Sequence, residues 1–307
     1  MVTLKRPSGS FFEEGMPSGR VVIMLGFMRS GKTNFSVVLM DQAAQKGYKV
    51  FCNTHFFRPE QIEQAKNKKL LNKNINYKVV PENITVVTTA YQLLKGLHKH
   101  QLGNKQSLVF LDEASLFAGS TMGMQTRVRW LKNLIVTIGK LNSSIMLIWQ
   151  AKSSVIPMLR EELVSMELLI KKKGSHRMCE VRSLKEGDKR LVWCWYSLPE
   201  TRLPYDTRAI SEFVFDIDSD YLFAEVSKYN TLDMVDKFLP VLEKSKEIQS
   251  LKDNNNKKEK KPTIRSILKN ELQDNPRLEW EEAKKKKGLK DLKRDYFYRL
   301  RQELGIG

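Results

Sequence analysis

The chain has 307 residues, a length that suits one large domain and a smaller one, and its apolar share of 41% is enough to build a substantial core. A formal net charge of +18, from 53 lysines and arginines against 35 aspartates and glutamates, argues against an enzyme that meets only neutral partners. It favours a polyanionic partner, of which nucleic acid is the commonest, over lysine-rich surfaces that merely face solvent.

Strand and helix patterns alternate along residues 20–150. Residues 1–20 hold several glycines and prolines and are expected to form an irregular arm. Apolar runs that predict buried strands lie at Arg20–Leu25, Tyr48–Cys52, Ile84–Thr88, Ser107–Leu111 and Ser144–Trp149. Helices are expected between them, at Lys32–Lys46, Pro59–Leu71, Ala90–His100 and Thr126–Leu141. This alternation predicts an α/β fold with a doubly wound, mainly parallel sheet.

The pattern changes after the last of these strands. Strand patterns that follow one another without helices predict an antiparallel extension of the sheet, at Met166–Lys171, Arg177–Arg182 and Leu191–Ser197. A helical pattern at Asp220–Leu242 completes a core domain expected to span residues 1–243. Residues 244–262 are rich in lysine and asparagine and predict a basic, flexible linker. Residues 263–307 predict a helical module, with helices near Thr263–Asn275, Leu278–Lys287 and Lys290–Leu304.

Residues 26–33 match the phosphate-loop pattern G-x-x-x-x-G-K-[ST] between an expected strand and an expected helix. Glycines let backbone N–H groups curl around phosphate oxygens, and the helix offers its positive N-terminus to the anion. A chance match in a chain of this length has a probability of about one in a hundred, so we interpret the segment as an ATP site rather than an ordinary turn. The expected nucleotide contacts are Gly26, Phe27, Met28, Arg29, Ser30, Gly31, Lys32, Thr33 and Asn34.

Two acids directly follow the apolar strand pattern Ser107–Leu111. Asp112 and Glu113 are therefore expected at the C-terminal edge of the sheet, where open α/β sheets bind their ligands. With Lys32 on the β- and γ-phosphates and the Thr33 hydroxyl on Mg²⁺, Asp112 would hold the same ion through a water. Glu113 would orient and deprotonate the attacking water as a catalytic base. An ordinary acid pair at a strand–turn junction is the alternative.

Gln150 ends the strand pattern Ser144–Trp149 and is expected at the same edge. Its amide could bond both the γ-phosphate and the attacking water, which makes it a third catalytic candidate; a satisfied polar residue at a strand end is the alternative. Phosphoryl transfer is often stabilised by an arginine from a neighbouring subunit. Arg127, Arg129 and Arg160 are candidates for this trans-acting role, and the sequence does not choose among them.

The order of these motifs resembles the FtsK/HerA superfamily of DNA-pumping ATPases over roughly residues 20–207. Support comes from Gly139-Lys140 before the strand that ends at Gln150. Residues 204–207, Pro-Tyr-Asp-Thr, are similar to a signature of small viral members, including packaging ATPases and the Zot-like proteins of filamentous phages. The resemblance implies a RecA-like core and a ring, commonly a hexamer, that moves double-stranded DNA through its centre. It also implies a trans-acting arginine at the position that Lys140 occupies.

Residues 280–300 resemble a helix-turn-helix, with Ala283 as the small packed residue and Gly288 near the turn. Such a unit inserts its second helix into the major groove of DNA. The cations expected to neutralise phosphates are Lys290, Lys293, Arg294, Arg299 and Arg301. The alternative is a solvated three-helix appendage that docks on the ring.

Two functions from different classes remain open. The first is an ATP-driven double-stranded DNA translocase, a ring homo-oligomer for genome packaging, plasmid transfer or DNA-end processing, with a capsid, portal protein or nuclease as a further partner. The second is a Zot-like NTPase of virion assembly or export that does not pump duplex DNA; a P-loop kinase or signalling NTPase leaves Gln150 and the basic module unexplained. The three cysteines form no C-x-x-C pair and no segment approaches the roughly 20 apolar residues that span a bilayer, so we expect a soluble protein of the cytoplasm.

Overall fold

The chain divides into two compact units, Met1–Gln249 and Ser250–Gly307. The computed structural model describes residues 19–27, 29–101, 106–113, 124–150, 162–173, 176–184, 191–195, 197–206, 209, 211, 213–230, 233–259, 264–286, 289 and 293–304. Met28, Arg160 and Lys290, together with the side chain of Arg127, lie outside the described residues, so the roles predicted for them stay predictions.

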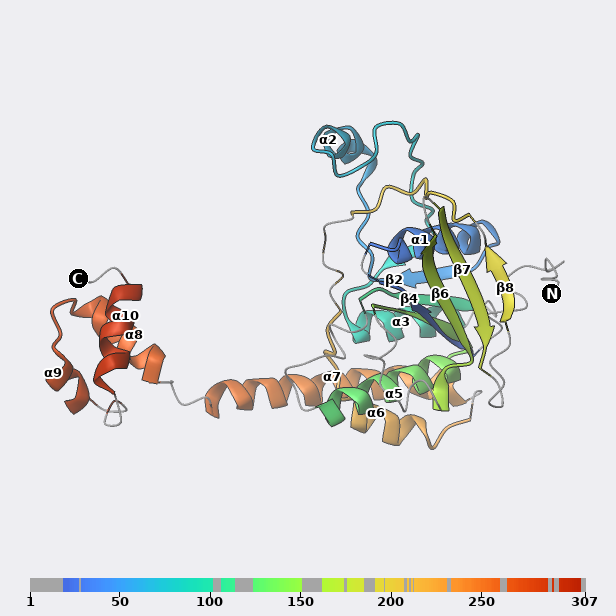
Figure 1. Cartoon of the computed structure of the whole chain (residues 1–307). Helices are drawn as coiled ribbons and strands as arrows, with labels where there is room; N and C mark the ends of the chain where they lie inside the picture. Colours follow the sequence, from blue (N-terminus) through green and yellow to red (C-terminus); the bar gives the residue numbers. More distant parts are fainter. Residues whose placement is uncertain are drawn as a thin grey trace. The chain divides into compact units, whose positions relative to one another are not determined.

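The first unit is built on one sheet of eight strands in the order β3-β2-β4-β5-β1-β6-β7-β8 (Figure 1). The strands are β1 (Val21–Leu25), β2 (Lys49–Cys52), β3 (Ile84–Val86), β4 (Ser107–Leu111), β5 (Ser143–Trp149), β6 (Met166–Lys173), β7 (His176–Ser183) and β8 (Leu191–Trp195). Neighbours from β3 to β6 are parallel, whereas β7 pairs antiparallel with both β6 and β8. The predicted α/β fold is confirmed, with the correction that β6 runs parallel to β1, so the antiparallel extension begins at β7.

Helices cover both faces of this sheet (Figure 1). They are α1 (Lys32–Gln45), the short turn η2 (Pro59–Gln61), α2 (Ile62–Asn67), α3 (Ala90–Gln101), α5 (Met124–Lys140), α6 (Ser219–Val226) and α7 (Asp233–Glu259). In β1, Val21, Ile23 and Leu25 join a core with α3, α5, α6 and α7, whereas Val22 and Met24 join a core with α1. Because side chains alternate between the faces of a strand, a strand covered on both sides is apolar at every position.

The carboxyl ends of four parallel strands meet at one edge of the sheet. Leu25 at the end of β1 lies beside Trp149 at the end of β5, and Leu111 at the end of β4 lies beside Leu147. Strand β2 ends in register beside β4. The residues that follow these strands therefore share the edge at which open α/β sheets bind ligands, namely Gly26, Asn53, Asp112 and Gln150.

Helix α7 runs to Glu259 and includes most of the segment predicted as a flexible linker. Its first half is anchored in the core of the first unit by Met234, Phe238 and Leu242, which are fully buried. Once packing has nucleated a helix, each further residue adds a hydrogen bond, and lysine and glutamate are good helix formers. The linker prediction is therefore corrected for residues 244–259, because composition alone does not reveal the packed helix that precedes them.

The second unit contains three helices, α8 (Ile264–Asp274), α9 (Trp280–Lys285) and α10 (Arg294–Glu303). Their apolar sides meet in a small core in which Leu272, Ala283 and Phe297 are fully buried. The burial of Ala283 agrees with a small packed residue on α9, and the assignment of a helix-turn-helix stays a prediction. Across both units, none of the described helices combines the length and apolarity needed to cross a membrane.

The cations predicted to face DNA divide into two groups. Lys293, Arg294 and Arg299 are exposed on or beside α10. Arg301 instead donates a hydrogen bond from Nη1 to the carbonyl oxygen of Leu278 at 3.1 Å, and its guanidinium lies 5.9 Å from the centre of the Phe297 ring. Arg301 therefore holds the three helices together, which corrects its assignment as a phosphate contact.

Candidate functional site

The phosphate loop connects β1 to α1, and its glycines are required by its shape. Gly31 has φ 96°, in the left-handed region that favours glycine, and Arg29 has φ 59°. A β-carbon at Gly26 would lie 2.7 Å from Ser30 Oγ and 2.9 Å from the carbonyl oxygen of Ile170 on β6. The two glycines thus permit the sharp turn and its close approach to the neighbouring strand.

The Lys32 ammonium lies against the loop that precedes it. Its Nζ donates hydrogen bonds to the carbonyl oxygens of Gly26 at 2.8 Å and Phe27 at 2.9 Å. Burial lowers the pKa of Lys32 because it disfavours the charged form, and the carboxylates of Asp112 and Glu113 oppose this shift. The lysine and the two acids therefore act on one another across the same small space.

Thr33 and Asp112 meet directly at the start of α1. Thr33 Oγ1 donates a hydrogen bond to Asp112 Oδ2 at 2.7 Å, and the other carboxylate oxygen of Asp112 accepts from the backbone N–H of Glu113 at 2.8 Å. Burial raises the pKa of Asp112, while these hydrogen bonds and the Lys32 charge lower it. Among the described residues there is no cluster of three or more His, Cys, Asp or Glu side chains that could hold a metal ion. One carboxylate and one hydroxyl suit Mg²⁺, which takes few protein ligands beside phosphates and water.

Glu113 occupies an unusual backbone position beside Asp112. Its φ of 52° lies in the left-handed region, a conformation that costs a residue with a β-carbon about 1–2 kcal/mol. Burial and the neighbouring Asp112 charge both raise the pKa of Glu113, and Lys32 opposes them. A strained conformation that aims a carboxylate into a pocket is typical of a functional residue.

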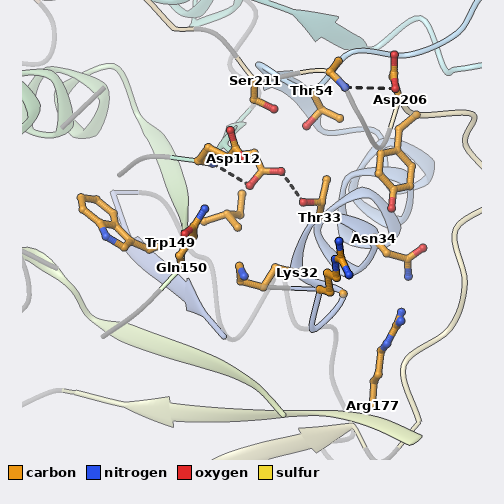
Figure 2. A pocket seen from close by; sticks show the side chains of 16 residues that line it. Lys32, Thr33, Asn34, Thr54, Asp112, Trp149, Gln150, Arg177, Asp206 and Ser211 are labelled. Atoms are coloured by element: carbon orange, nitrogen blue, oxygen red, sulfur yellow. Dashed lines mark hydrogen bonds between the residues drawn. The ribbon is translucent and has the colours of Figure 1, made fainter. Parts of the chain in front are cut away.

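The pocket around these groups has a volume of about 430 Å³. Figure 2 shows Lys32, Thr33, Asp112 and Gln150 converging on it from the ends of β1, β4 and β5. It is lined by Arg29, Gly31, Lys32, Thr33, Asn34, Thr54, Asp112, Glu113, Ile148, Trp149, Gln150, Arg177, Tyr205, Asp206, Ala209 and Ser211. The structure thus brings the predicted lysine, threonine, acids and glutamine together.

Asn53 is a site residue that the sequence did not reveal. It is fully buried after β2, where its Nδ2 donates to the carbonyl oxygen of Asp112 at 3.1 Å and its Oδ1 accepts from the Asp112 N–H at 2.7 Å. Its Nδ2 also lies 3.4 Å from the carbonyl oxygen of Ser211. This amide fixes the backbone that carries Asp112; the available signal was a polar residue directly after an apolar strand, the same signal that identified Gln150.

Asn53→Ala is expected to destabilise the first unit by about 1–3 kcal/mol, because it leaves the buried N–H and carbonyl of Asp112 without partners. Chemical denaturation measures this loss, and Asn74→Ala, at an exposed position, is the matched control. Equal stability of the two variants would show that the amide does not hold Asp112.

Other lining residues were only partly anticipated. Tyr205 and Asp206 belong to the signature that the sequence analysis singled out, and they line the pocket. Burial raises the pKa of Tyr205 to about 12, which keeps its hydroxyl neutral. Thr54 is buried, and its Oγ1 has no hydrogen-bond partner within the described part of the chain. Arg177, on β7, was not predicted at all.

The side chain of Asn34 is engaged away from the loop. Its Nδ2 donates to the carbonyl oxygen of Pro199 at 3.0 Å, and its Oδ1 accepts from the Thr201 N–H at 3.2 Å. Asn34 therefore ties the first turn of α1 to the segment that follows β8, and any contact it makes with a nucleotide is left to its backbone N–H.

The candidates for a trans-acting cation are not equivalent. Lys140 Nζ donates to the carbonyl oxygens of Val226 at 2.7 Å and Tyr229 at 3.2 Å, so it binds the C-terminal end of α6. This engagement corrects its expected role in a neighbouring subunit. Arg129 forms an ion pair with Asp220 at 2.8 Å. Because both partners are largely exposed, the pair contributes about 0–1 kcal/mol, and Arg129 stays a candidate.

Comparison with known proteins gives one family match. The family model described as zonular occludens toxin (Zot) matches residues 20–188. A search of the curated proteins finds no match. Among solved structures, an isolated ATPase domain aligns with a TM-score of 0.41 at 14% identity, over 62% of this chain and 86% of that chain. The flagellar accessory protein FlaH from Methanocaldococcus jannaschii aligns with a TM-score of 0.38 at 16% identity, over 66% of this chain and 97% of that chain.

The family match decides the assignment, since the two solved structures are too remote to bear on substrate or partners. The matched residues are more than half of the chain and include the phosphate loop, both acids and Gln150. The predicted resemblance to Zot-like proteins is thereby confirmed. The chain belongs to the zonular occludens toxin (Zot) family and has the core of a P-loop NTPase.

Proposed function

We propose that the chain binds ATP with Mg²⁺ between β1 and α1 and hydrolyses it. The observation that carries this proposal is the 2.7 Å hydrogen bond between Thr33 Oγ1 and Asp112 Oδ2 beside the phosphate loop. A hydroxyl and a buried carboxylate in contact at a helix N-terminus suit a hard cation that shares its oxygen ligands with phosphate. The residues present therefore fit the metal and the nucleotide together.

Each group has a separate part in the reaction. The Lys32 ammonium neutralises charge on the phosphates. Thr33 and Asp112 would hold Mg²⁺, which supplies charge stabilisation at the phosphate oxygens when bound. Glu113 accepts the proton of the attacking water as its general base, and Gln150 orients that water from the adjacent strand.

The finer proposal is that hydrolysis drives movement of double-stranded DNA through a ring of subunits, commonly six. The net charge of +18 supports a polyanionic partner. The exposed cations of the second unit, Lys293, Arg294 and Arg299, support a contact with phosphates. Arg127, Arg129 and Arg160 remain the proposed sources of a trans-acting arginine.

The ATPase rate with and without duplex DNA tests this finer proposal, and several-fold stimulation is expected. Replacing Lys293, Arg294 and Arg299 together with alanine should lower the slope of log affinity against log salt by roughly 2 to 3, because each lost phosphate contact removes close to one released counterion. The matched control replaces three exposed lysines of the first unit, Lys68, Lys73 and Lys99. An unchanged slope in the first variant would show that the second unit is not the DNA contact.

Membership of the Zot family favours a second candidate, an NTPase of virion assembly or export that does not pump duplex DNA. An ATPase rate indifferent to duplex DNA is the result that this candidate predicts. A capsid or portal protein, or a nuclease, is the further partner proposed for a packaging motor, and the host cytoplasm is its proposed location.

A further inference from the structure

Arg177 on β7 lies directly against the phosphate loop, although it is 145 residues away in the sequence from Lys32. A β-carbon at Gly31 would lie 3.0 Å from both Cδ and Nη1 of Arg177. Figure 2 shows its side chain reaching from the antiparallel part of the sheet towards the start of α1, and the residue lines the nucleotide pocket. The side chain of an otherwise peripheral strand is thus part of the pocket wall.

The guanidinium of Arg177 is uncommitted within the described part of the chain, where none of the hydrogen bonds or ion pairs involves it. The other cations of this hairpin behave differently. Lys171 and Arg182 both pair with Glu180, at 2.6 Å and 2.8 Å. Arg177 therefore presents a full positive charge and five unused N–H donors to the pocket.

The backbone of Arg177 is held in place relative to α1. Its carbonyl oxygen accepts a hydrogen bond from the Leu198 N–H at 3.0 Å. The same segment is fastened to the first turn of α1, because Asn34 bonds both Pro199 and Thr201. This bridge positions the arginine beside the loop before any ligand arrives, which reduces the entropy lost on binding.

We propose that Arg177 binds the α- and β-phosphates of a nucleotide held by the phosphate loop of the same chain. This inference rests on the proposed function. Asp112, Glu113 and Gln150 mark the end of the pocket where the γ-phosphate is cleaved. Figure 2 shows Arg177 on the Asn34 side of α1, across the loop from Asp112, so its fork of donors faces the part of the phosphate chain that ADP and ATP share.

Binding measured by calorimetry tests the proposal. The probes are ADP, inorganic pyrophosphate, and ATP in a Glu113→Gln background that prevents turnover. Arg177→Ala should weaken all three by a similar factor of about 10- to 100-fold, the loss expected for charge-assisted hydrogen bonds. Arg177→Lys should recover part of this affinity because it keeps the charge and loses the fork. Arg182→Ala, on the same strand but paired with Glu180 outside the pocket, should bind as the unchanged protein does.

Each other outcome overturns the proposal. A larger loss for ATP than for ADP would place the guanidinium on the γ-phosphate. A loss for ADP that spares pyrophosphate would place it on the nucleoside, and unchanged affinity for all three would leave it without a role in binding. Mixing Arg177→Ala chains with Lys32→Ala chains should restore nothing; restored binding would mean that the arginine acts on a neighbouring subunit. Failure of the unchanged protein to bind any probe would instead remove the proposed function itself.

Discussion

Glu113→Gln lowers the rate of ATP hydrolysis by about 10²- to 10⁴-fold while ATP binding is retained, if Glu113 is the general base. Glutamine has nearly the shape of glutamate but cannot take a proton from water at neutral pH. The side chain lines the nucleotide pocket and burial raises its pKa, so it is a stronger base than an exposed glutamate. Steady-state phosphate release and calorimetric ATP binding, measured on the same preparation, separate the two effects.

Glu60→Gln is the matched control for this substitution, because Glu60 is exposed in the turn before α2. It should change neither rate nor affinity. A Glu113→Gln protein that hydrolyses ATP at the original rate would remove the carboxylate from the mechanism. Loss of rate and of binding in equal measure would make it a residue that maintains the pocket rather than a base.

Lys32→Ala is the second large effect, and it acts on binding as well as on hydrolysis. The substitution removes the ammonium that neutralises phosphate charge and also the two hydrogen bonds that hold the loop at Gly26 and Phe27. ATP affinity should fall by at least about 10-fold, the equivalent of one charge-assisted hydrogen bond, and hydrolysis should fall to background. Calorimetry and phosphate release measure both quantities.

Lys99→Ala, in the exposed face of α3, provides the comparison for that experiment. Because Lys32 is nearly buried, its replacement also calls for a thermal unfolding curve. A Lys32→Ala protein that remains folded and still turns over ATP would contradict the role assigned to the phosphate loop.

The sheet was predictable because its signals are local. Strands β1, β4 and β5 are buried at every position and are apolar in every residue except serines at the start of β4 and β5. Such runs admit one interpretation when helical patterns separate them. The phosphate loop was predictable for a related reason, since the turn it makes depends on glycines at fixed spacing.

Asn53 and Arg177 could not be found in this way. Asn53 acts on Asp112, 59 positions later in the chain, and Arg177 meets Gly31 only because β6 and β7 extend the sheet beside β1. Neither residue lies in a pattern of fixed spacing, so only the folded arrangement reveals its partner. Lys140 and Arg301 failed for the opposite reason, because a cation in a helix looks exposed until its carbonyl partners on other segments are known.

The central claim is that Thr33 and Asp112 form the metal end of a nucleotide site, and calorimetric titration of the full chain with ATP in Mg²⁺ and again in EDTA tests it most directly. The claim predicts a clear binding isotherm in Mg²⁺ that weakens strongly when the metal is chelated. Absence of any ATP uptake, or binding of equal strength in both buffers, would contradict it.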